Sequence, residues 1–158
     1  MKQRRILLAL TFALTITSCQ MPLRSSNAEP IAPSEIYVID GDTVRVRDQP
    51  PNVRLVGFNA PETWRAACPA EQLQGDKAAR RLRELVRAGK LDFEFIACSC
   101  PAGTQGTPVC NYGRNCGVLK ASGRDVGEIL IAEGLAVPFM CSTTRCPPTP
   151  RPWCASAR

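Results

Sequence analysis

The sequence contains no histidine among its 158 residues. Ser-His-Asp and Cys-His catalytic sites, His-metal finger sites and any imidazole acid or base are therefore excluded. Hydrolysis, if the protein performs it, has to rely on carboxylates, arginines and a hard metal ion. The Cys-x-x-Cys pattern of common zinc sites is also missing, which disfavours a zinc cluster.

The apolar run at residues 6–16 is too short to span a bilayer. A basic start precedes this run, a pattern typical of an export signal over residues 1–18. The letters ITSC, ending at Cys19, resemble a bacterial lipobox and predict lipidation of Cys19 and attachment to a membrane. Ordinary cleavage after Ala28 is the alternative. We therefore expect a protein that is exported to the periplasm, the cell envelope or the medium.

Nine cysteines are present, and Cys19 lies in the expected leader. The other eight form an even set, as expected for disulfides in an oxidising compartment. A metal cluster of the cysteines between residues 98 and 116 is the alternative. The eight are Cys68, Cys98, Cys100, Cys110, Cys116, Cys141, Cys146 and Cys154.

The charge of the chain is only mildly basic once the leader is set aside. The full sequence has 20 basic and 14 acidic residues, a net charge of +6. Residues 1–18 contain three basic and no acidic residues, so their removal leaves a charge of +3. This balance is compatible with a polyanionic partner but does not identify one.

Periodicity predicts five short strands and two helices. A tight turn at Asp40, Gly41 and Asp42 separates two β-branched stretches and predicts a hairpin, and Pro50 and Pro51 are expected in the turn before the third strand. Apolar residues at helical spacing predict a first helix with Asp76 as its N-cap, and a capping box at Asp125 begins the second. The expected strands are residues 36–39, 43–46, 53–58, 91–96 and 117–121, and the expected helices are residues 75–89 and 125–134.

These elements indicate a single α+β domain over residues 35–140. A polar tether is expected at residues 19–34, and a Pro- and Cys-rich strap at residues 141–158. The Gly-, Pro- and Cys-rich residues 98–116 are expected to form a loop that disulfides hold. Strands this short are typical of a small closed or partly open barrel.

Four separated motifs carry a resemblance to a known family. They are VIDGDTV at residues 38–44, VRLVGFNAPET at residues 53–63, NYGR at residues 111–114 and GLAVP at residues 134–138. In order and spacing they resemble the staphylococcal nuclease (thermonuclease) family over most of the expected domain. The resemblance implies a five-stranded Greek-key OB-fold barrel with packed helices. It also implies calcium-dependent cleavage of DNA and RNA to 3′-phosphate products, and we expect a monomer.

The residues within these motifs suit phosphodiester hydrolysis. That reaction needs a cation near the phosphoryl oxygens, donors for the transition state and a group that activates water. A carboxylate offers the hard oxygen that calcium prefers, and each arginine can donate two N–H groups to a phosphate. The resemblance implies a calcium site at Asp42, Asn59 and the backbone carbonyl of Ala60, and catalytic roles for Arg54, Glu62 and Arg114.

Two positions depart from the family pattern. Asn59 stands where a second calcium-binding aspartate is usual, which removes a negative charge from the site, although Asp40 could compensate. Cys110 stands where an acidic residue is expected, and a disulfide is the proposed replacement for an ion pair. A nucleic-acid-binding OB-fold module without catalysis and a disulfide-rich envelope lipoprotein are the alternative functions.

Overall fold

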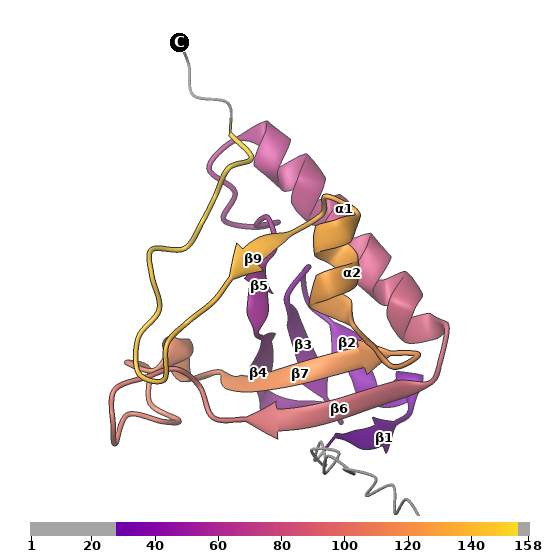
Figure 1. The fold of residues 1–158 in the computed structure, drawn as a ribbon. Coiled ribbons are helices and arrows are strands. Elements are labelled where there is room, and N and C mark those ends of the chain that lie inside the picture. Colours follow the sequence, from indigo (N-terminus) through magenta and orange to yellow (C-terminus); the bar gives the residue numbers. More distant parts are fainter. Residues whose placement is uncertain (1–27, 155–158) are drawn as a thin grey trace, which may run out of the picture.

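The computed structural model describes residues 28–154, shown as a ribbon in Figure 1. The expected export signal, and Cys19 with its expected lipid, lie outside the described residues. Within the described part, no helix is long and apolar enough to cross a membrane.

The expected hairpin is present and continues into a third strand. Strand β2 (Ile36–Val38) pairs antiparallel with β3 (Thr43–Val46), which pairs antiparallel with β4 (Gln49–Leu55). The prediction of a turn at Pro50 and Pro51 is wrong, because both prolines lie inside β4. The chain reverses earlier, at Arg47 and Asp48, which both have a φ of 52°. The part of β4 that pairs with a second strand, residues 53–55, comes after the prolines. This second pairing therefore does not need the N–H groups that the prolines lack.

The remaining strands extend this sheet. Strands β1 (Glu29–Ile31), β6 (Leu91–Ile96), β7 (Asn115–Ala121) and β8 (Arg124–Asp125) complete it. Its order is β1-β6-β7-β4-β3-β2, with β8 on β7, and β4 runs parallel to β7. A separate two-stranded ladder joins β5 (Gly57–Asn59) to β9 (Val137–Phe139). The α+β class is confirmed, but no described pairing joins β1 to β2, so hydrogen bonds do not close a barrel.

Two expected boundaries are corrected. Residues 29–31, expected in the tether, form β1, because Ile31 packs into the core and this strand pairs with β6. A short 3-10 helix, Pro33–Glu35, follows. The third expected strand is divided into β4 and β5, and Gly57 supplies the φ of +92° at which the chain changes direction.

The first helix, α1 (Pro69–Arg87), begins earlier than predicted. Cys68 is its N-cap and Pro69 its first residue, so Asp76 lies within the helix and the capping prediction is wrong. Gly75 is also inside α1, where a Cβ would lie 2.6 Å from the carbonyl oxygen of Glu62. The glycine therefore reflects close packing of the helix on the chain, not the start of the helix.

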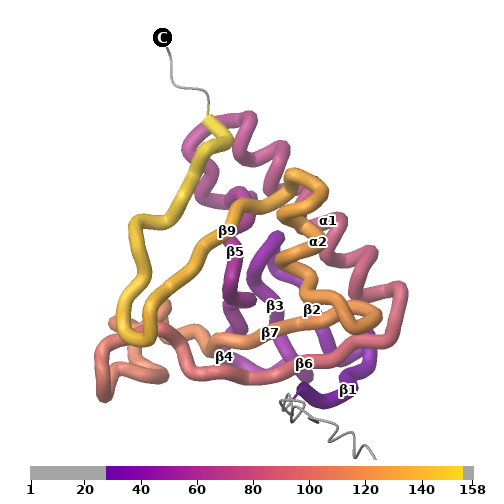
Figure 2. Tube along the Cα trace, viewed as in Figure 1, coloured from indigo at the N-terminus to yellow at the C-terminus, as the bar shows by residue number. Residues whose placement is uncertain are grey.

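The second helix, α2 (Val126–Ala132), begins where it was predicted. The Asp125 side chain accepts hydrogen bonds from the backbone N–H groups of Gly127 and Glu128. Figures 1 and 2 show α2 beside α1 on one side of the molecule. Apolar residues of both helices, including Leu82 and Leu130, join those of the strands in one buried cluster.

All eight cysteines of the expected domain and strap form disulfides, which confirms the expected covalent framework. Two close the loop between β6 and β7, and a third lies within the strap. The fourth joins the end of the described strap to the start of α1. The trace in Figure 2 shows the two segments lying side by side. The pairs are Cys68–Cys154, Cys98–Cys116, Cys100–Cys110 and Cys141–Cys146.

Candidate active site

The turn between β2 and β3 directs Asp42 into the protein. The Asp40 side chain accepts the backbone N–H of Asp42 at 3.0 Å, an arrangement that stabilises the turn. A Cβ on Gly41 would lie 2.6 Å from the Cβ of Ala60 and 2.9 Å from that of Ala78. Only glycine fits there, and the close approach leaves Asp42 just 7% exposed.

The Asp42 carboxylate joins the hairpin to the segment that follows β5. One oxygen accepts the backbone N–H of Ala60 at 2.8 Å. The other accepts the Thr43 hydroxyl at 3.2 Å and forms an ion pair with Arg54. Both oxygens are therefore bonded within the protein, as a buried carboxylate requires.

Arg54 lies on β4, opposite Thr43 of β3. Its Nη2 atom donates to the carbonyl oxygen of Phe58 at 3.1 Å and to the side-chain oxygen of Asn59 at 2.7 Å. Burial, and to a lesser degree the charge of Arg114, lower the pKa of Arg54 to about 10. The guanidinium remains charged at neutral pH, and its position is set by several contacts at once.

Arg114 reaches the same place from the end of the disulfide-bonded loop. It donates to the Thr43 hydroxyl at 3.2 Å, and to the backbone and side-chain oxygens of Asn111 at 3.2 and 2.9 Å. The ring of the exposed Tyr112 lies 5.7 Å from its guanidinium carbon. Burial lowers the pKa of Arg114. In the described part of the chain its hydrogen-bond partners, Thr43 and Asn111, are neutral.

Glu62 follows β5 and is partly exposed. Its negative charge raises the pKa values of Arg54 and Arg114 against the larger effect of burial, so it lies within electrostatic range of both guanidinium groups. The fold thus brings Arg114, from the motif at residues 111–114, near Arg54 and Glu62, which both belong to the motif at residues 53–63. A carboxylate near two arginines can accept a proton while the arginines bind an oxyanion.

The donors expected to bind calcium are only partly available. Within residues 28–154, no group of three or more His, Cys, Asp or Glu side chains is placed to hold a metal ion. Asp42 and Asp40 supply hard oxygens, and burial raises the pKa of Asp40. The amide oxygen of Asn59 already accepts from Arg54. A calcium ion at these residues would therefore take most of its six to eight ligands from water.

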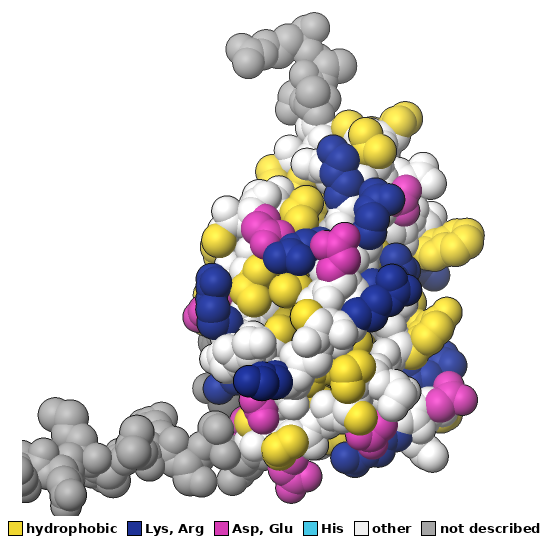
Figure 3. Space-filling view, turned by 90° about the vertical axis from the view of Figure 1, so that its right-hand side faces the viewer, with side chains coloured by type: hydrophobic (Ala, Val, Ile, Leu, Met, Phe, Trp, Pro, Cys, Tyr) yellow, Lys and Arg dark blue, Asp and Glu magenta, His cyan; other side chains and the backbone are white. Residues whose placement is uncertain are grey.

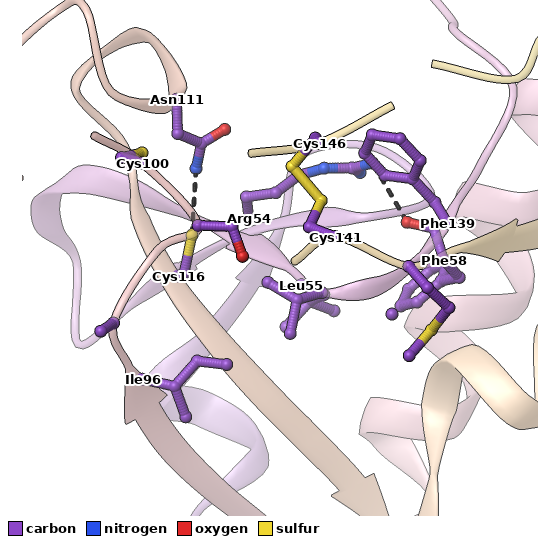
Figure 4. A pocket seen from close by; sticks show the side chains of 15 residues that line it. Arg54, Leu55, Phe58, Ile96, Cys100, Asn111, Cys116, Phe139, Cys141 and Cys146 are labelled. Carbon is purple, nitrogen blue, oxygen red and sulfur yellow. Dashed lines mark hydrogen bonds between the residues drawn. A yellow bond between two sulfur atoms is a disulfide. The ribbon is translucent and has the colours of Figure 1, made fainter. Parts of the chain in front are cut away.

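A pocket of about 340 Å³ opens beside Arg54 (Figure 4). Apolar side chains provide most of its lining, among them Phe58 from β5 and Phe139 from β9. Asn111 contributes from the loop, and the Cys141–Cys146 disulfide contributes from the strap. The pocket therefore places an apolar surface next to a guanidinium group, a combination that suits a ligand with both a flat apolar part and a phosphate.

The contacts of the site include residues to which the sequence reasoning gave no role. Thr43 links Asp42 to Arg114, and Asn111 holds Arg114 from the loop. Both lie inside the recognised motifs, next to Asp42 and near Arg114 in the sequence, so the motifs already indicated that they are close to the site. The backbone carbonyl of Pro150 accepts a hydrogen bond from Asn59 at 3.0 Å, and nothing in the sequence indicated that contact.

The face of the molecule in Figure 3 does not present a single-sign patch. Lys and Arg side chains are interspersed there with Asp and Glu side chains. This face therefore provides no concentrated positive field for a polyanion.

The known proteins to which the chain is similar include two from Bacillus subtilis (strain 168). The chain is 36% identical over 101 residues to "Endonuclease YncB", a match that covers 62% of this chain and 43% of that protein. It is 35% identical over 101 residues to "SPbeta prophage-derived endonuclease YokF", covering 62% of this chain and 31% of that protein. The chain thus spans less than half the length of these curated relatives. No protein-family model matches it.

Proposed function

We propose that this protein is an endonuclease of the staphylococcal nuclease type, which hydrolyses phosphodiester bonds in DNA and RNA and leaves 3′-phosphates. The observation that carries the proposal is the convergence of Arg54 and Arg114 on Asp42 and Thr43, with Glu62 within electrostatic range of both arginines. The two relatives named endonucleases support it. An OB-type fold belongs to the same proposal, supported by the short strands and the two packed helices.

In this proposal the two arginines act on the phosphoryl group and Glu62 acts on water. Glu62 accepts a proton from the water that attacks phosphorus. The bond to the 5′ oxygen breaks, and this oxygen takes a proton from solvent water to leave as the 5′-hydroxyl. Arg54 and Arg114 donate N–H groups to the phosphoryl oxygens, whose charge grows in the transition state. Their existing contacts to Asp42, Thr43 and Asn111 hold them before the substrate arrives, which lowers the cost of ordering them.

The proposal includes Ca²⁺ as the cofactor. Asp42 would hold the ion with help from Asp40, and the carbonyl of Ala60 would be a further donor. The family resemblance also implies Asn59, whose amide oxygen accepts a hydrogen bond from Arg54 in this structure. A bound calcium ion would supply positive charge that offsets the charge of the phosphate. We also propose that the protein is exported and attached to a membrane through a lipid on Cys19; the four disulfides support export.

Kinetics with denatured DNA test the proposal. The oxidised protein should cleave this substrate in millimolar CaCl₂ and stop in excess chelator. Arg54→Ala and Arg114→Ala should each lower turnover by about 10² to 10³, more than they weaken binding. Glu62→Gln should bind an oligonucleotide like the parent but turn over far more slowly. Arg87→Ala, which removes an exposed charge at the end of α1, is the matched control and should retain parental turnover.

A binding module without catalysis is the second candidate. The observation that favours it is the number of internal partners of Arg54, which Asp42, Phe58 and Asn59 already engage. Such a module would bind DNA with an affinity that falls steeply with salt, with no cleavage. Parental cleavage rates in Glu62→Gln and both arginine variants would assign any measured activity to another site or a contaminant.

A further inference from the structure

The described C-terminal strap (residues 141–154) runs from β9 to the start of α1, as Figure 1 shows. Between these two ends, Pro150 contacts Asn59 of the site. We propose that the strap is a positioning element of the active site, which orients the Asn59 amide so that its oxygen holds Arg54. The inference rests on the proposed function. It also accounts for an asparagine where the family usually has an aspartate.

The geometry of the Asn59 amide carries the first step. Its oxygen accepts from Arg54 at 2.7 Å, and its nitrogen donates to the carbonyl oxygen of Pro150 at 3.0 Å. A guanidinium can only donate and a backbone carbonyl can only accept, so these two partners fix which end of the amide faces each of them. An amide released from Pro150 could turn its NH₂ toward Arg54, where two donors would oppose each other.

An aspartate at position 59 would not serve this arrangement. A carboxylate has no N–H to offer Pro150, and its oxygen would face the carbonyl oxygen across the same short distance. It would also place a second negative charge on Arg54, which already pairs with Asp42. Asparagine satisfies the strap and leaves more of the positive charge of Arg54 for a phosphate.

The strap is itself held firmly next to this contact. The Arg151 side chain donates to both carboxylate oxygens of Glu71 on α1 at 2.9 and 2.8 Å, and to the carbonyl oxygen of Arg65 at 2.8 Å. Glu71 is 0% exposed, and its carboxylate also accepts the N–H of Ala67 at 2.7 Å. Three residues further on, Cys154 is bonded to Cys68. These anchors fix the Pro150 carbonyl from the side of α1.

A strap released at one end provides the test. The two tryptophans of the chain are Trp64, which is 91% exposed, and the half-buried Trp153 beside Cys154. In a Trp64→Phe background, emission from Trp153 therefore reports the position of the strap.

Two variants release the strap. Cys68→Ser/Cys154→Ser frees the end of the strap, and Glu71→Gln/Arg151→Met removes its ion pair without leaving a buried charge. Arg81→Met, which breaks the two-point pair between Arg81 on α1 and Glu133 at the end of α2, is the matched control.

With denatured DNA and CaCl₂, both strap variants should lower kcat by about 10- to 100-fold, the range expected when a catalytic group is misplaced by about 1 Å. Their KM should change less, Trp153 emission should shift to longer wavelength, and Arg81→Met should keep the parental kcat. Asn59→Ala should lower kcat by a similar factor. Combined with a released strap, it should cause no further loss, because both changes remove the same contact.

Asn59→Asp separates this role from a purely structural one. It should shift Trp153 emission in the intact protein, without substrate. It should also lower kcat in the intact protein, and most of this decrease should disappear once the strap is released. Two outcomes would overturn the inference. In the first, the decreases in kcat caused by strap release and by Asn59→Ala multiply when the changes are combined. In the second, a released strap keeps the parental kcat while Trp153 emission shifts. If the parent itself does not cleave DNA, the proposed function fails; unchanged Trp153 emission in Asn59→Asp would then overturn the contact independently.

Discussion

Arg54 and Arg114 approach the same site from two regions that are stabilised in different ways. Arg54 lies on β4 between Val53 and Leu55, which both belong to the large apolar core. Arg114 ends a loop between β6 and β7 whose buried side chains are cysteines, namely Cys98, Cys100 and Cys110. The large core contains no cysteine, and the smaller cluster around the loop is built on four.

The difference shows two solutions to one requirement. Each arginine must be held in place before a phosphate binds, and the loss of chain entropy must be offset. Apolar burial does this where strands and helices pack together. The loop offers few apolar side chains, so its cross-links limit the freedom of the unfolded chain instead. Changes in the two regions should therefore have distinguishable effects.

The largest effect on stability is expected in the apolar region. Leu82→Ala removes a fully buried side chain from the core and should lower the free energy of unfolding by about 2 to 5 kcal/mol. Urea denaturation measures the change. Leu73→Ala, on the same helix but exposed, is the control and should change stability little. At a temperature where the variant is folded, kcat should stay near the parental value, and a large fall would show that the core also tunes the site.

Removal of the Cys98–Cys116 disulfide should come next in size. Its residues are 18 apart in sequence, so loss of the link should lower the unfolding free energy by about 3 kcal/mol. Asn111, which holds Arg114, donates to the sulfur of Cys116 at 3.3 Å (Figure 4). Cys98→Ala/Cys116→Ala should therefore lower kcat as well as stability. Parental kcat in the folded variant would contradict a role for this link in placing Arg114.

Acid should weaken the anchoring of the strap more gradually. Hydrogen bonds from Arg151 hold the pKa of Glu71 below its usual 4.5. A carboxyl whose folded pKa is lowered stabilises the fold above its unfolded pKa, and this contribution is lost as pH falls through the folded value. Unfolding free energies measured from about pH 7 down to about pH 3 should fall more steeply in the parent than in Glu71→Gln/Arg151→Met. Equal slopes would remove Glu71 from the acid response.

The smallest effect is expected at the surface. Arg81 and Glu133 form a two-point pair, but both side chains are about one-third exposed. Arg81→Met should therefore cost about 0.2 to 1 kcal/mol, less at high salt. Thermal denaturation at low and high salt measures this. A loss as large as that of a disulfide would show that surface charge contributes to this fold as much as the cross-links do.

Local features of the chain could be predicted because they depend on neighbours in sequence. The hairpin turn at Asp40, Gly41 and Asp42, the Asp125 helix cap and the strand from Leu91 to Ile96 were predicted correctly. The even count of cysteines in the expected domain and strap predicted a full set of disulfides. The prediction of Asp76 as an N-cap was wrong, because α1 begins at Pro69 and already includes Gly75, which packs against the backbone of Glu62.

By itself, then, the sequence determined the chemistry that is possible: no imidazole, two arginines and a glutamate in recognisable motifs, and an oxidised set of cysteines. Only the tertiary structure decided which strands, cysteines and side chains pair with one another. The parallel pairing of β4 with β7, the addition of β1 to β6, the choice of Cys154 for Cys68 and the contact of Pro150 with Asn59 all join distant parts of the chain. Local preference carries no information about such contacts, because they form only where burial of the whole core brings the segments together.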